Sequence, residues 1–127
     1  MENQGWFQKL SRMPVNEAQH QIYVFDWAQY QPVCKDYLFC IPNGGKRDPI
    51  TAKSLQKQGV RPGVSDMFLA YPNNEYHGLW IELKKDTTCQ ATPLQKHWLD
   101  KMNKVGFKAL VAYGFEDAIA NIEEYLK

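Results

Sequence analysis

Met67-Phe68-Leu69-Ala70 and Leu79-Trp80-Ile81-Glu82-Leu83 are the two short apolar runs on which the fold of this chain depends. Runs of this length and composition are typical of β-strands. Residues 71–78 between them include a proline, two asparagines and a glycine, which favour turns. The pattern therefore predicts an antiparallel hairpin that folds near Asn74 or Glu75.

This hairpin gathers polar side chains at one end. Its register is expected to place Asp66 opposite Lys84 or one of the neighbours of Lys84. Side chains alternate between the two faces of a strand, so Glu82 and Lys84 point the same way. Ile81 and Leu83, which alternate with them along the strand, point into the core. Two carboxylates and one lysine are thereby expected close together.

These three side chains suit metal-assisted chemistry on a phosphate. Asp66 and Glu82 offer the hard oxygen ligands that Mg²⁺ or Mn²⁺ prefers. A bound cation lowers the pKa of its water and neutralises the charge that develops on an attacked phosphate. Lys84 can orient or deprotonate that water and stabilise the negative charge. The plain alternative is that Glu82 and Lys84 belong to a solvated strand face.

Several segments, in their order and spacing, resemble one nuclease family. They are Gly59-Val60-Arg61-Pro62-Gly63-Val64-Ser65-Asp66, Trp80-Ile81-Glu82-Leu83-Lys84-Lys85, Gln95-Lys96-His97-Trp98, Glu17 with Gln21, and the turn Pro42-Asn43-Gly44-Gly45. The family is VRR-NUC, the virus-type replication-repair nucleases, a branch of the PD-(D/E)xK nucleases. The resemblance spans residues 16–127. It departs at Ser65, where the family usually has a proline that shapes the backbone and binds nothing.

The resemblance implies a Mg²⁺- or Mn²⁺-dependent deoxyribonuclease with a PD-(D/E)xK core. The implied catalytic residues are Asp66, Glu82, Lys84 and Gln95, and the implied metal ligands are Asp66, Glu82, Leu83 and Glu17. Stand-alone members resemble Holliday-junction resolvases, so the implied substrate is branched DNA, the implied assembly a homodimer, and the implied setting phage-like replication, repair or recombination. The alternative is a nucleic-acid-binding module without catalysis, or one specific for flap, single-strand or duplex DNA.

Two residues of this set also have ordinary structural interpretations. Glu17, in the first turn of a helix, is favourable there because the helix dipole attracts a carboxylate. Gln95, in the first turn of another helix, can face solvent instead of pointing toward Lys84. Only the resemblance assigns a role at the metal site to either residue.

Composition limits the class of protein. A chain of 127 residues with 44% hydrophobic residues is expected to form one domain with a single core. It has no apolar run long enough to span a membrane, and its N-terminus lacks the pattern of a signal peptide. Cys34, Cys40 and Cys89 are an odd number without ligand spacing, which favours idle thiols in a cytoplasmic protein over a disulfide framework or a zinc site with His20, His77 or His97.

The formal net charge is only +1, but the charges are unevenly distributed. Residues 44–64 carry five basic and one acidic side chain, residues 84–108 carry six and two, and the last fifteen residues are acidic. Two basic segments beside an acidic hairpin predict a phosphate-binding surface, whereas solvated helix faces are the alternative. The candidate DNA contacts are Arg61, Lys85, Asn43, Gly44, Lys46, Arg47 and Lys53. The glycine turn that follows Asn43 serves a tight turn equally well.

The remaining pattern predicts four helices and two further strands. An arm, residues 1–15, carries Trp6, Phe7 and Leu10 and precedes the domain of residues 16–127. The first helix is expected over 16–29, with Ala18, Ile22 and Phe25 buried and with Tyr23 and Trp27 offering exposed surface for a dimer. A strand over 37–41 and a helix over 48–58 follow. After the hairpin come a helix capped by Thr92 with Leu94, Trp98, Met102 and Val105 on its stripe, a strand over 107–113, and a helix over 115–126 with Ala118, Ile119, Ile122 and Tyr125 inward.

The order α-β-α-β-β-α-β-α predicts the fold class. An α/β domain is expected, with a mixed sheet of about four strands flanked by helices. The last β-α-β unit is expected to be a right-handed parallel crossover. The PD-(D/E)xK core that the resemblance implies has this same arrangement.

Overall fold

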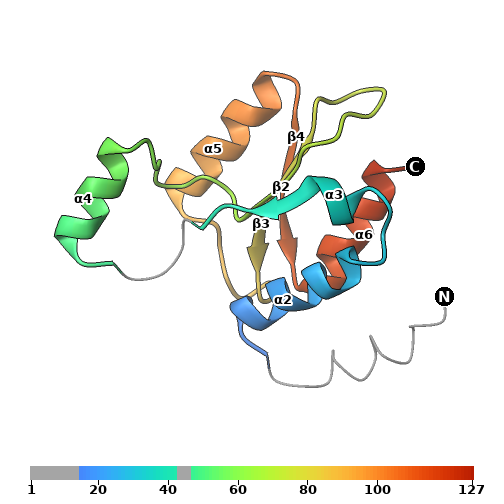
Figure 1. Cartoon of the computed structure of the whole chain (residues 1–127), viewed down its shortest axis with the longest axis horizontal. Coiled ribbons are helices and arrows are strands. Elements are labelled where there is room, and N and C mark those ends of the chain that lie inside the picture. The colour runs from blue at the N-terminus through green and yellow to red at the C-terminus, as the bar shows by residue number, and fades with distance from the viewer. Residues whose placement is uncertain (1–14, 43–46) are drawn as a thin grey trace.

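A four-stranded mixed sheet forms the centre of the protein, seen here in a computed structural model that describes residues 15–42 and 47–127 (Figure 1). The strand order is β1-β2-β3-β4, with antiparallel pairing from β1 to β3 and parallel pairing between β3 and β4. The strands are β1 (Leu38–Cys40), β2 (Met67–Leu69), β3 (Leu79–Lys84) and β4 (Lys108–Tyr113). The predicted fold class and the parallel last unit are confirmed.

The helices cover both faces of this sheet. Helices α2 (Glu17–Ala28) and α6 (Phe115–Tyr125) pack on the face that carries Ile81 and Leu83, and these elements share the main core. Helix α5 (Pro93–Lys104) lies on the opposite side of β4 from α6 (Figure 1). The four predicted inward residues of α6 are all buried.

The hairpin of β2 and β3 has the predicted antiparallel pairing. Met67 pairs with Ile81 and Leu69 with Leu79. The turn segment is fixed by Asn73, whose side-chain oxygen accepts hydrogen bonds from the backbone N–H groups of Glu75 and Tyr76. Such bonds from an asparagine to the backbone just ahead of it set a turn locally, which is why the sequence alone predicts this hairpin.

The buried face of α2 differs from the prediction. Val24, Trp27 and Ala28 are buried, whereas Ala18 is exposed and Ile22 is 51% exposed. Apolar residues surround the C-terminal half of this helix, so periodicity alone does not select a face, and packing against α6 and β3 does. The prediction that Trp27 is exposed for a dimer is therefore wrong.

The apolar stripe predicted for α5 extends farther toward both ends of the helix than the buried residues do. Leu94 is 59% exposed and Val105 is 58% exposed, while Leu99 is buried. Trp98 and Met102 are half-buried, as expected for the stripe. The helix contacts β3 and β4, while the side chains of Leu94 and Val105 at its two ends face solvent.

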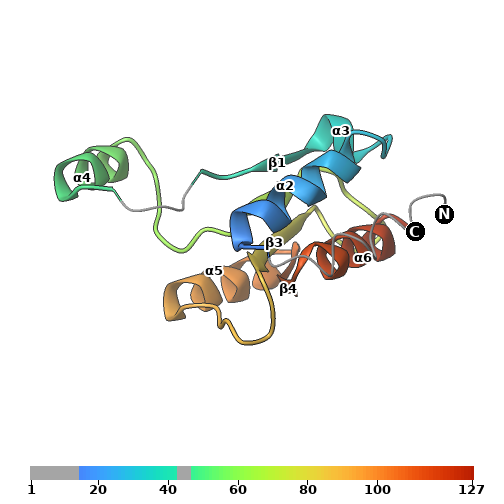
Figure 2. The same cartoon turned by 90° about the horizontal axis from the view of Figure 1, so that it is seen from below.

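Two segments near β1 complete the fold. The unpredicted short helix α3 (Cys34–Tyr37) begins where the Gln31 side-chain oxygen accepts hydrogen bonds from the N–H groups of Val33 and Cys34. Because α3 includes Tyr37, β1 is shorter than expected. Helix α4 (Pro49–Lys57) is capped by the Asp48 carboxylate, has no buried residue and stands apart from the sheet (Figure 2).

Cys34, Cys40 and Cys89 all lie within the described residues and form no disulfide. Burial raises the pKa of Cys34 to about 12, and all three cysteines are free. Across the described ranges, no helix is both long and apolar enough to cross a membrane. The predicted arm of residues 1–15 lies outside the described residues except for Val15.

Candidate active site

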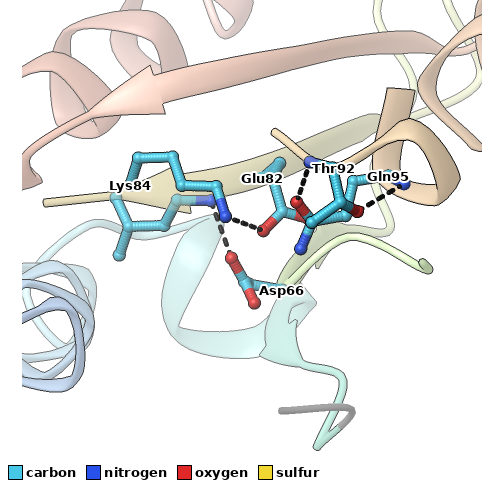
Figure 3. Close-up of polar contacts among 6 residues, drawn as sticks. Asp66, Glu82, Lys84, Thr92 and Gln95 are labelled. Atoms are coloured by element: carbon cyan, nitrogen blue, oxygen red, sulfur yellow. Dashed lines mark hydrogen bonds and ion pairs between the residues drawn. The ribbon is translucent and has the colours of Figure 1, made fainter. Parts of the chain in front are cut away.

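The hairpin brings Asp66, Glu82 and Lys84 together (Figure 3). Continuing the register one step beyond Met67 and Ile81 sets Asp66 beside Glu82, the neighbour of Lys84 on the same strand face. One Asp66 carboxylate oxygen accepts a hydrogen bond from the backbone N–H of Leu83 at 2.7 Å. The Asp66 side chain is thereby fixed against β3.

The Glu82 carboxylate is buried without hydrogen-bond donors. Glu82 is 1% exposed, and neither of its oxygens has a hydrogen-bond partner within the described residues. Lys84 Nζ lies 3.7 Å from one Glu82 oxygen, too far for a good hydrogen bond but close enough for an ion pair. Burying such a group is costly unless a charge or ligand compensates it. The expectation of a solvated strand face for Glu82 and Lys84 is therefore wrong.

Electrostatics around Glu82 favour a bound cation. Burial first, and then the neighbouring Asp66 carboxyl, raise the pKa of Glu82 to about 9, while the Lys84 ammonium opposes this rise. In the metal-free protein Glu82 is therefore protonated at neutral pH. A divalent cation would displace this proton, because metal ligands must be deprotonated to bind.

The donor atoms fit a cation that keeps several water ligands. Leu83 is buried with its side chain in the core, so only its backbone carbonyl can act as a ligand. Within the described part of the chain, no three His, Cys, Asp or Glu side chains are close enough to hold a metal ion by themselves. Asp66 and Glu82 therefore form a two-carboxylate site of the kind that Mg²⁺ completes with water and phosphate oxygens.

Glu17 approaches this site from the first turn of α2. Burial raises the pKa of Glu17, the Lys84 ammonium lowers it, and the Asp66 carboxylate raises it. These influences place the Glu17 carboxyl within electrostatic reach of the site. Among the described residues Glu17 does not join the two other carboxylates in a three-ligand group, so its contact with the metal, direct or through water, stays a prediction.

Gln95 is held by the start of α5. Its side-chain oxygen accepts a hydrogen bond from the Thr92 N–H at 2.8 Å, and the Thr92 hydroxyl accepts one from the Gln95 N–H (Figure 3). This is a capping box, which fixes the side chain of Gln95 and the helix terminus together. Its carbonyl is committed to the cap, and the structure brings it into no direct bond with Lys84.

Gly63 shapes the loop beside the site, a role that the sequence pattern does not identify. Its φ of +86° is in the left-handed region, and a Cβ there would lie 2.7 Å from the backbone carbonyl carbon of Leu94. The loop that leads to Asp66 is thus packed directly on the first turn of α5. A positive φ beside Asp66 could have been suspected from the Pro62-Gly63 pair, but its contact could not.

The residues predicted to contact DNA lie in different parts of the structure. Arg61 and Lys85 are exposed. Arg61 lies in the loop that leads to Asp66, and Lys85 directly follows Lys84. Arg47 donates a hydrogen bond to the Pro42 carbonyl at 2.8 Å, and Lys53 lies on the projecting α4. Three of the predicted contacts lie outside the described residues: Asn43, Gly44 and Lys46.

The raised pKa of Glu82 predicts how stability depends on pH. The unfolded chain releases the Glu82 proton near pH 4.5, whereas the folded, metal-free protein holds it to about pH 9. The folded state binds more protons between these values, so the free energy of unfolding falls as pH rises, by at most about 1.4 kcal/mol per pH unit. We expect the melting temperature in EDTA to decrease from pH 5.5 to pH 8.5 (about three pH units within this window).

Glu82→Gln isolates this effect because other titrating groups, His20 among them, are common to both proteins. The variant should lack the part of the slope that Glu82 contributes. Identical slopes in the two proteins would contradict the assignment.

Comparison with known proteins gives a family-model match and a similar solved structure. The family model described as the VRR-NUC domain matches residues 3–116. A solved structure described as a VRR_NUC domain protein superposes with a TM-score of 0.79, at 31% sequence identity over 90% of each chain. A search of curated proteins finds no match.

Proposed function

The chain belongs to the VRR-NUC domain family, and from this premise we propose that it is a divalent-metal-dependent DNA endonuclease. Membership of the family implies a nuclease of the PD-(D/E)xK type. The observation that carries the proposal is the buried Glu82 carboxylate, which has no hydrogen-bond partner in the described chain and lies beside Asp66 and Lys84. A protein that only binds DNA gains nothing from two carboxylates placed near phosphates.

Each site residue has a distinct role in this proposal. Asp66, Glu82 and the Leu83 carbonyl hold Mg²⁺ or Mn²⁺, with Glu17 contributing through water. The bound cation lowers the pKa of a water and neutralises charge on the phosphate. Lys84 Nζ orients the attacking water as the ammonium, or accepts its proton as the neutral amine, and Gln95 positions the start of α5 beside the site. Arg61 and Lys85 bind phosphates of the DNA strand.

A cleavage assay tests the reaction class. Labelled single-stranded, duplex, flap and four-way DNA are incubated with and without Mg²⁺ or Mn²⁺. Cutting that needs the metal supports the endonuclease, whereas full activity in EDTA overturns the metal requirement. Tight binding without cutting under every metal condition would favour the alternative of a nucleic-acid-binding module.

Substrate binding should depend on phosphates and on the shape of the DNA. The basic side chains near the site, Arg61 and Lys85, are exposed and of the type that binds phosphates. We expect the affinity for DNA to fall roughly a hundredfold between about 50 and about 200 mM salt, and to differ little between unrelated sequences of one shape. Fluorescence anisotropy at several salt concentrations measures both, and a flat salt response would contradict the proposal.

We further propose a homodimer that cuts branched DNA. The described residues offer one candidate metal site, whereas symmetric cutting of a four-way junction requires two, and a closed two-fold dimer supplies them. With Trp27 buried, Ile22 is the large apolar residue that α2 exposes and is therefore the candidate for an interface. Light scattering should give twice the 14.8 kDa of the single chain. A monomer, or unpaired cuts on flaps, would contradict this proposal.

A further inference from the structure

An aromatic row lies on the same sheet face as the carboxylates. Phe39, Phe68 and Trp80 are paired across β1, β2 and β3. Asp66 precedes Phe68 by two residues, and Glu82 follows Trp80 by two, so all five side chains point to one face. The row lies two residues, roughly 6.8 Å, along the strands from the candidate metal site.

The rings in this row are firmly supported at one end. Phe68 and Trp80 stack with ring centroids 4.2 Å apart, and the edge of Trp98 from α5 packs on Trp80 at 5.2 Å. Phe107 packs edge-on against Phe68 at 5.8 Å. These contacts hold the inner rings in fixed orientations beneath α5.

The other end of the row is exposed. Phe39 packs edge-on against Phe68, with centroids 5.9 Å apart, yet it remains 47% exposed on the edge strand β1. Helix α5 covers β3 and β4, which leaves the β1 end of this face open. Phe39 is therefore a rigidly backed aromatic ring beside the carboxylates.

Positive charge accompanies this exposed ring. Just beyond the end of β1, the guanidinium of Arg47 donates to the Pro42 carbonyl, which holds the charge near the strand end. An aromatic ring combined with a basic side chain is the pairing by which proteins bind unpaired nucleotides: the base stacks on the ring while the cation contacts the phosphate.

We propose that Phe39, backed by Phe68, stacks against an unpaired base next to the phosphate that is cut, and that Arg47 contacts a neighbouring phosphate. The inference rests on the proposed nuclease function and specifies its substrate: DNA in which a nucleotide beside the cut is unstacked, as at a junction or a single-stranded segment. Fully stacked duplex cannot offer a base to this ring.

The test measures binding without cleavage, so that it is independent of catalysis. Three proteins that all carry Asp66→Asn are compared: one with Phe39, one with Phe39→Ala and one with Phe39→Trp. Each is tested for binding to single-stranded oligonucleotides that carry one abasic position. The abasic position is moved stepwise along the strand from one oligonucleotide to the next. Tyr30→Ala is the matched control, because Tyr30 is an exposed aromatic (88%) just past the C-terminal end of α2, whereas Glu17 is at the other end. Circular dichroism confirms that each variant is folded.

With Phe39 present, one abasic position should weaken binding about 5- to 100-fold. Phe39→Ala should weaken binding of the intact strand by a similar factor and abolish the effect of that position, while Phe39→Trp should preserve it. Equal abasic effects with Phe39 and with alanine, or a loss with Tyr30→Ala equal to that with Phe39→Ala, would overturn the inference. So would conversion of a dimer into a monomer by Phe39→Ala, which would assign this face to a second copy of the chain. Absence of cleavage by the unaltered protein would instead refute the nuclease function. The binding result would still decide whether Phe39 stacks on a base.

Discussion

Asp66→Asn is expected to reduce DNA cleavage at least about a thousandfold, since it removes one of two carboxylates that hold the cation and therefore both the activated water and the charge neutralisation. The amide can still accept the hydrogen bond from the Leu83 N–H, so the local structure should persist. Single-turnover cleavage in saturating Mn²⁺ measures the loss.

Glu82→Gln should have an effect of the same size for the same reason. In the absence of metal, DNA binding is expected to tighten for Asp66→Asn, which loses a negative charge beside the phosphates, and to persist for Glu82→Gln, because the Glu82 carboxyl is already protonated at neutral pH. Glu75→Gln is the matched control: Glu75 is an exposed carboxylate in the hairpin turn, away from the site. Wild-type cleavage rates in Asp66→Asn would show that the cation is not held as proposed.

Lys84→Met is expected to lower single-turnover cleavage by about a hundredfold to a thousandfold while the cation still binds. Methionine keeps the apolar part of the buried side chain, so packing is largely retained, but no group remains to orient the water or accept its proton. Calorimetric titration with Mn²⁺ separates metal binding from the loss of turnover. Lys35→Met, which changes an exposed lysine on α3, is the control.

The same substitution has a second consequence for pH dependence. Because the Lys84 ammonium lowers the pKa of Glu82, its removal should raise that pKa further and shift metal binding to higher pH. Rates should therefore be compared at a pH where both proteins are saturated with metal. A variant that binds Mn²⁺ normally and cleaves at the wild-type rate would remove Lys84 from the mechanism.

The sequence predicts well where its signals are local. The turn around Asn73 fixes the hairpin through bonds within a few residues, and strand alternation then places Asp66 beside Glu82 whatever the rest of the chain does. The cap at Thr92 and the inward stripe of α6 are local for the same reason. Clustering of the candidate site therefore followed from the sequence.

The sequence does not predict which of several apolar faces is buried. Helix α2 has apolar residues around much of its surface, and only packing against α6 and β3 selects Val24 and Trp27 over Ile22. In α5, the apolar Leu94 and Val105 extend the stripe in the sequence, but their side chains face solvent. Both errors arise because periodicity carries no information about the neighbouring element.

The sequence by itself determined the hairpin and the meeting of Asp66, Glu82 and Lys84, since both depend on a turn and on strand alternation among residues close together in the chain. Only the tertiary structure decided how those groups behave. Glu82 becomes a buried carboxyl with a raised pKa because distant elements exclude water from it, and desolvation depends on the whole packed surroundings rather than on sequence spacing.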